Sequence, residues 1–188
     1  MRRNRKASTA NGITLWSVAH LGVAITTAAA GIASLIWQMG WLGYVVAVIA
    51  DAYLILLLIE VAMRRKSAGV AERWLLDVPL AITTLAIVAM LAIAIVTSFA
   101  SMYLSTDGIA ENSARETEHR RLDNVYDAVY FSTVTFTTLG YGDFVPVTRW
   151  ARMLVVWQLA TTVLFLLGIL PLVISRLADF DLRDQPPG

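Results

Sequence analysis

The chain of 188 residues has no cysteine and only two histidines. It can therefore form neither a disulfide nor a zinc–thiolate site. Charged residues make up 15% of the chain and the formal net charge is +1, so the total charge gives no indication of a nucleic-acid partner. No group of polar residues resembles a catalytic constellation, and we do not expect an enzyme.

Apolar residues dominate what is present. They make up 57% of the chain, against about 45–50% in a soluble domain, and the mean hydropathy is +0.65. A membrane-crossing helix needs about 20 such residues. Four runs reach that length: 13–39, 41–61, 78–103 and 153–175. The first exceeds the apolar core of a signal peptide, about 7–15 residues, so we favour a retained span over a cleaved leader.

Lysine and arginine precede the first run, separate the second from the third, and follow the fourth. Such residues concentrate in cytoplasmic loops. We therefore expect a plasma or inner membrane protein surrounded by lipid, with both termini cytoplasmic. The predicted parts are a cytoplasmic N-terminus (1–12), a peripheral transmembrane hairpin (13–63), a cytoplasmic linker (64–77), a pore domain (78–175) and a cytoplasmic tail (176–188). The linker could be an amphipathic surface helix or a solvated connection.

Residues 125–137 form an apolar segment about half as long as a span, and Thr138-Leu139-Gly140-Tyr141-Gly142-Asp143 follows directly. A half-length helix that enters and returns is a re-entrant segment. The region 130–146 strongly resembles the pore of the potassium channel superfamily, and the resemblance extends over 78–175. Together with the four apolar runs, it implies an all-α membrane protein with four transmembrane helices, and a re-entrant pore helix and filter between the third and fourth. Its function would be passive, selective conduction of K⁺.

The resemblance also implies roles for individual residues. The selectivity filter would consist of Thr138, Leu139, Gly140, Tyr141 and Gly142. Backbone carbonyls of the first four, with the Thr138 hydroxyl, would bind K⁺ as the permeant ion. Because the backbone must alternate in hand, glycine is expected at positive φ, at Gly140 and Gly142. One filter strand cannot surround an ion, so we expect a homotetramer.

Four further residues are predicted to support the filter: Asp143, Tyr130, Thr137 and Val134. Tyr130 is the expected hydroxyl partner of Asp143. Val134 stands where two-helix bacterial relatives often carry a glutamate that pairs with the filter aspartate. This difference puts a carboxyl-linked inactivation mechanism in doubt.

The gate has two interpretations. Gly168 and Pro171 can bend the last helix, and Leu170 and Ile174 would form narrow apolar rings that stop ions by dewetting. Alternatively, the filter itself gates. No span carries arginine at every third position, so we expect no voltage sensor.

Two polar positions in the hairpin stay open. If the first two spans rise equally from their turn, residues whose numbers sum to about 79 lie level. Asp51 would then face Thr26 and Thr27, either as a helix-joining hydrogen bond or as a proton or ligand sensor. His20 would lie level with Glu60, as an interfacial pair or a pH switch.

Three rival functions remain. A non-selective cation channel usually lacks the tyrosine or second glycine, which Tyr141 and Gly142 supply here. A related potassium transporter would carry four pore segments in one chain. An accessory subunit that only co-assembles differs in having no conduction of its own.

Overall fold

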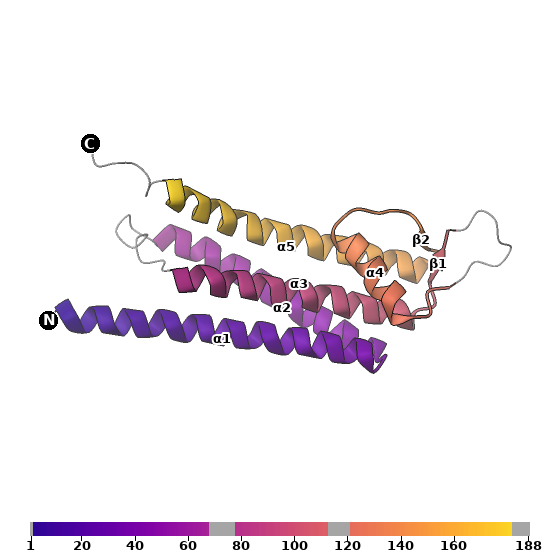
Figure 1. Ribbon diagram of the computed structural model, residues 1–188, viewed down its shortest axis with the longest axis horizontal. Helices are drawn as coiled ribbons and strands as arrows, with labels where there is room; N and C mark the ends of the chain where they lie inside the picture. The colour runs from indigo at the N-terminus through magenta and orange to yellow at the C-terminus, as the bar shows by residue number, and fades with distance from the viewer. Residues whose placement is uncertain (1, 68–77, 113–120, 182–188) are drawn as a thin grey trace.

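The computed structural model describes residues 2–67, 78–112 and 121–181, with side chains described at 18–59, 85–112 and 121–168. Four long helices lie side by side (Figure 1): α1 (Arg2–Ile36), α2 (Gly40–Ser67), α3 (Val78–Ser105) and α5 (Arg149–Asp181). The shorter helix α4 (Val125–Phe136) lies between α3 and α5 in the chain, toward one end of the molecule. Helix α1 begins and α5 ends at the opposite end.

Each long helix contains a stretch apolar and long enough to cross a membrane. Within the described residues these stretches are Val18–Ile36, Gly40–Ile59, Leu85–Ser105 and Arg149–Gly168. The predicted fold class, an all-α membrane protein with four spans, is therefore confirmed. The helices α1 and α5 continue past the apolar runs, because arginine, lysine and alanine are good helix formers. The predicted linker at 64–77 begins inside α2, and residues 68–77 lie outside the described part of the chain.

The turn between α1 and α2 is tight, as a transmembrane hairpin requires. It consists of residues 37–39, and Gln38 has a φ of 50°. The Met39 amide donates to the Ser34 carbonyl at 2.9 Å, which satisfies one of the last carbonyls of α1. So short a turn forces α1 and α2 to run antiparallel.

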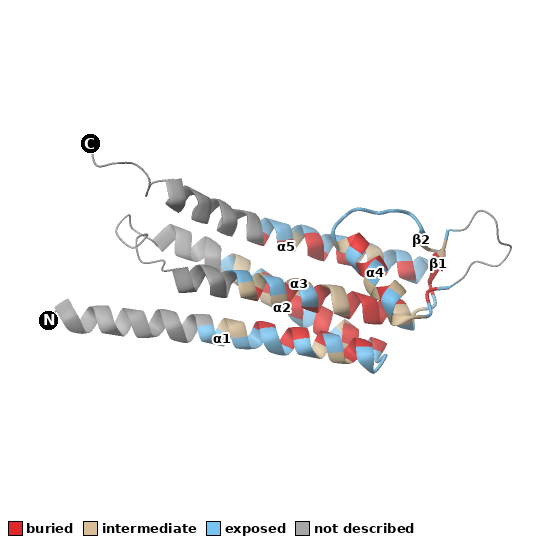
Figure 2. Cartoon of the chain, viewed as in Figure 1, coloured by how far each residue is buried: buried red, intermediate tan, exposed pale blue. Residues whose placement is uncertain are grey.

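Helix α3 packs against all four other helices and forms the centre of the subunit. Phe99, Ala100 and Tyr103 are fully buried, and Figure 2 shows buried positions gathered where the helices face one another. Close approach depends on small residues. A Cβ atom added at Gly43 of α2 would lie 2.9 Å from the Ser98 carbonyl oxygen of α3.

A small sheet, which the sequence did not reveal, pairs the loop after α3 with the segment after the filter. Strands β1 (Ile109–Glu111) and β2 (Phe144–Pro146) are antiparallel. Ala110 pairs with Val145 at the centre of the register. Three-residue strands are too short to leave a periodic pattern in the sequence.

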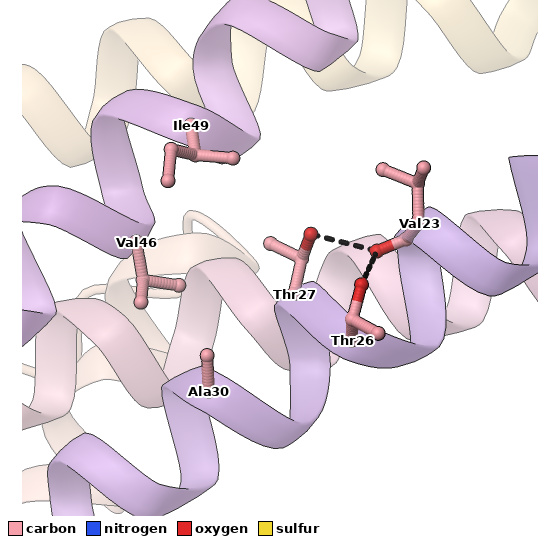
Figure 3. A pocket seen from close by; sticks show the side chains of 6 residues that line it. All are labelled: Val23, Thr26, Thr27, Ala30, Val46 and Ile49. Atoms are coloured by element: carbon pink, nitrogen blue, oxygen red, sulfur yellow. Dashed lines mark hydrogen bonds between the residues drawn. The ribbon is translucent and has the colours of Figure 1, made fainter.

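The predicted partners of Asp51 are wrong. Thr26 and Thr27 donate their hydroxyls to the Val23 carbonyl of their own helix, at 2.9 and 2.7 Å (Figure 3). The Asp51 carboxylate instead accepts hydrogen bonds from Trp157 and Thr161 of α5. Equal rise fixes which residues are level, but it does not fix which way each helix faces.

The predicted level of His20 with Glu60 stays a prediction, because it falls partly outside the described side chains. His20 Nδ1 lies 2.7 Å from the Tyr53 hydroxyl of α2, and their rings are in tilted contact. The side chain of Glu60 lies outside the described part. The structure therefore gives His20 an aromatic partner in the hairpin.

Candidate functional site

Helix α4 positions the candidate filter. Asn124 caps its start: the side-chain oxygen accepts from the Asp127 amide at 2.8 Å, because the first amides of a helix lack intrahelical partners. Phe131 packs edge-on against Tyr103 of α3, with ring centroids 4.9 Å apart. Phe136 contacts Phe165 of α5 at 5.3 Å in the same manner. Aromatic contacts from the middle and from the last residue of α4 thus hold it between α3 and α5.

The backbone after α4 alternates in hand. Thr138, Gly140 and Gly142 have φ angles of 58°, 58° and 77°. Positive φ was expected at both glycines, whereas Thr138 is an addition, since a β-branched residue adopts this conformation rarely. The Thr138 amide donates to the Thr135 carbonyl at 3.0 Å, and such a bond at the helix end helps to fix the unusual conformation. The chain leaves α4 directly into the alternating segment.

The side chains of this segment are open to solvent in the single chain. Leu139 is 60% exposed and Tyr141 67% exposed. Nothing lies within 4 Å of a Cβ added at Gly140 or Gly142. Among the described residues of the single chain, therefore, none covers most of the Leu139 and Tyr141 side chains.

The predicted contact between Tyr130 and Asp143 is present. The Tyr130 hydroxyl donates to Asp143 Oδ2 at 2.6 Å, and the Phe144 amide donates to Oδ1 at 3.0 Å. The hydrogen bond to the carboxylate raises the pKa of Tyr130 to about 12, so the hydroxyl keeps its proton at neutral pH. This bond joins α4 to Asp143, which directly follows the alternating segment.

The two other predicted support residues lie at the C-terminal end of α4. Val134 is 7% exposed, and its carbonyl accepts from the Leu139 amide at 3.0 Å. The Thr137 hydroxyl donates to the Thr133 carbonyl at 2.8 Å. Val134 holds the junction through its backbone carbonyl and Thr137 through its hydroxyl, while the Val134 side chain packs as an apolar group.

Asn112 is a contact that the sequence did not suggest. Its side-chain amide donates to the Gly142 carbonyl at 3.0 Å, and its backbone amide donates to the Asp143 carbonyl at 2.6 Å. The small sheet brings it there, because Asn112 follows β1 and Asp143 precedes β2. The loop after α3 therefore holds the end of the alternating segment, at Gly142 and Asp143, in place.

Gln158 of α5 is a second residue that sequence reasoning missed. It is fully buried and accepts from the Tyr103 hydroxyl at 2.7 Å. Its amide nitrogen lies 2.9 Å from both the carbonyl and the hydroxyl oxygen of Ser132, and the Ser132 hydroxyl donates to the Val96 carbonyl at 2.8 Å. This network joins α3, α4 and α5. The signal that the sequence offered for Gln158 was one amide side chain within an otherwise apolar run.

The predicted gate is described only in part. Gly168 is buried against α2, where an added Cβ would lie 3.2 Å from Leu58 Cδ2. The side chains of Leu170, Pro171 and Ile174 lie outside the described part. Helix α5 continues to Asp181 through these positions.

The chemistry that these groups offer is coordination by oxygen. In the described part of the chain, no three histidine, cysteine or acidic side chains gather as a metal site. Backbone carbonyls in the alternating segment are the candidate ligands for a hard monovalent cation.

Comparison with known proteins agrees with this arrangement. Residues 82–179, more than half of the chain, match the family described as "Ion channel". "Two-pore potassium channel 4" of Arabidopsis thaliana is 48% identical over 50 residues, which cover 27% of this chain and 18% of the relative. "Probable potassium channel protein 2" of Methanocaldococcus jannaschii is 33% identical over 96 residues, covering 51% of this chain and 23% of the relative. The chain thus spans a minor part of these relatives' lengths, and no solved structure matches it.

Proposed function

Because the chain belongs to the potassium channel superfamily, we propose that it conducts K⁺ passively and selectively across the membrane through a pore built from four identical copies. It is a channel subunit and not an enzyme. The observation that carries the proposal is the alternating backbone of residues 138–142, with positive φ at every second residue, held between α4 and the small sheet.

Selectivity follows from the backbone of this filter. A K⁺ ion must exchange its water shell for protein oxygens at little net cost. Alternation in hand lets the carbonyls of Thr138, Leu139, Gly140 and Tyr141 face one axis, with the Thr138 hydroxyl at the innermost site. The C-terminal end of α4, where the helix dipole is negative, leads directly into the filter and would favour a cation there.

Four copies complete the site. One chain supplies one filter strand, and an ion on a central axis needs oxygens from all sides. The exposed Leu139 and Tyr141 side chains support this assembly, because neighbouring subunits would cover them. Leu159, Val163 and Leu166 of α5 are also exposed, at 37%, 54% and 51%, as expected for a helix that lines a pore or contacts another subunit.

The domain organisation of the multi-pass chain is proposed as predicted. Residues 13–63 form a peripheral hairpin and 78–175 the pore domain. Residues 1–12, 64–77 and 176–188 face the cytoplasm, in a plasma or inner membrane. The Lys/Arg distribution supports this orientation, and α1 begins at the same end of the molecule at which α5 ends.

We place the gate near the cytoplasmic end of α5. Leu170 and Ile174 would each contribute a ring of four apolar side chains, which can dewet a narrow passage. Pro171 removes a backbone hydrogen bond between them, and Gly168 lies just above, so a bend there would move the lower ring most. Gating by the filter is the alternative. Ile174→Ser and Leu170→Ser raise resting conductance if the rings are the barrier, whereas unchanged conductance in both moves the gate to the filter.

The proposal is tested by flux through the purified protein alone in liposomes. We expect K⁺ uptake that exceeds Na⁺ uptake strongly, and a tetramer in native mass spectrometry. Equal K⁺ and Na⁺ flux would contradict selectivity and favour a non-selective channel. A tetramer without flux would favour an accessory subunit that needs a conducting partner.

A further inference from the structure

Helix α2 lies along the outer side of α5 and contacts it at three levels. At the first level, Trp150 Nε1 donates to the Tyr44 hydroxyl at 3.0 Å, and the Tyr44 ring stacks on Trp157 with centroids 6.3 Å apart. At the third level, the Leu58 side chain packs against Gly168. Tyr44 and Leu58 are fourteen residues apart and therefore lie on the same stripe of α2.

Asp51 occupies the middle level, seven residues from both Tyr44 and Leu58. Trp157 Nε1 donates to Asp51 Oδ2 at 2.7 Å, and the Thr161 hydroxyl donates to Oδ1 at 2.9 Å. Each carboxylate oxygen thus has its own donor from α5. A carboxylate within a membrane span is costly and persists where it is paired and has a function.

These contacts use the back of α5. At 100° per residue, Trp150, Trp157, Thr161 and Gly168 lie within about 40° of one another around the helix. Leu159, Val163 and Leu166 lie on the opposite side and are exposed in the single chain. The face proposed to line the pore or meet other subunits is therefore free of α2, while the other face is fastened to it.

We infer that Asp51 is a positioning residue. Its two hydrogen bonds to Trp157 and Thr161, which we call the latch, hold α5 against α2. Through them the peripheral hairpin sets the open probability of the pore. The inference rests on the proposed channel function. A rotation or bend of α5 that moves its front face also moves Trp157 and Thr161 relative to Asp51. Because a hydrogen bond is lost steeply with distance and angle, one arrangement of α5 is favoured over others.

The chemistry of the latch allows matched substitutions. Asp51→Leu removes both acceptors at similar volume. Asp51→Asn keeps an acceptor for Trp157, and its amide can donate to Thr161, because a hydroxyl can reverse its role. Thr161→Val removes one donor with little change in shape. Thr26→Val is the control. It also removes a threonine hydroxyl, but one in the hairpin that donates to carbonyls of its own helix α1.

The test is single-channel recording of these variants in bilayers. We expect Asp51→Leu and Thr161→Val to change open probability by about tenfold or more, since the loss repeats in every subunit. Asp51→Asn and Thr26→Val should stay near the unmodified protein, and the K⁺/Na⁺ permeability ratio should not change. In the Asp51→Leu background, Thr161→Val should add nothing.

Unchanged open probability in Thr161→Val would overturn the latch, and so would an Asp51→Asn effect as large as that of Asp51→Leu. If Asp51→Leu does not assemble, the recordings of Thr161→Val and Asp51→Asn decide the question.

A second measurement does not need conduction. The chain has no cysteine, so Leu58→Cys with Gly168→Cys reports the α2–α5 contact by disulfide formation. Thr161→Val should slow that reaction several-fold while Thr26→Val does not, and equal rates would also overturn the latch. Absence of K⁺ current in the unmodified protein would count against the proposed function instead.

Discussion

Removal of the buried Tyr103 hydroxyl, which joins α3 to α5, should destabilise the whole chain. In Tyr103→Phe, the buried Gln158 carbonyl oxygen loses its 2.7 Å hydrogen-bond donor. An unsatisfied buried acceptor costs about 1–3 kcal/mol. Hydrogen bonds between membrane helices average about 0.6 kcal/mol and reach about 1.7, because the unfolded chain also finds partners. The membrane value governs here, so we expect a loss of about 1 kcal/mol per subunit.

The assay is reversible unfolding in mixed micelles with increasing SDS, followed by far-UV circular dichroism. Tyr126→Phe is the matched control, since Tyr126 is 87% exposed. Gln158→Leu should destabilise as well, and the double variant with Tyr103→Phe should lose less than the sum, because both single changes remove the same bond. A Tyr103→Phe midpoint equal to that of the control, or strictly additive losses, would refute the reasoning.

Four further outcomes are expected. Gly142→Ala should reduce K⁺ flux at least about tenfold without dissociating the tetramer, because alanine resists a φ of 77°; Gly22→Ala, at an open helical position, is the control. Asn112→Ala should speed the decay of current during sustained activation, since the Gly142 carbonyl loses a donor; unchanged decay argues against it. Gly43→Val should lower stability in the SDS assay by about 1–3 kcal/mol, because its Cβ meets the Ser98 carbonyl. Conductance should depend weakly on voltage, and a curve with several gating charges would contradict this.

Local features of the chain were predicted well. The length and polarity of each apolar run determine a span, because lipid leaves backbone groups no other partners. The short turn at 37–39 makes the first two helices antiparallel whatever surrounds them. Gly140 and Gly142 indicate positive φ, because residues with a side chain resist that conformation. The Tyr130–Asp143 contact bridges only thirteen positions and follows from the family pattern.

Tertiary structure decided the contacts between distant segments. The sequence placed Asp51 within a span, but its partners on α5 are more than a hundred positions away. Asn112 reaches Gly142 because a small sheet, invisible as a pattern, folds one loop onto another. Thr138 adopts positive φ against its own preference, at the junction with α4. Composition fixes how far a helix runs, whereas its rotation and its neighbours follow from which small and polar side chains fit together across the bundle.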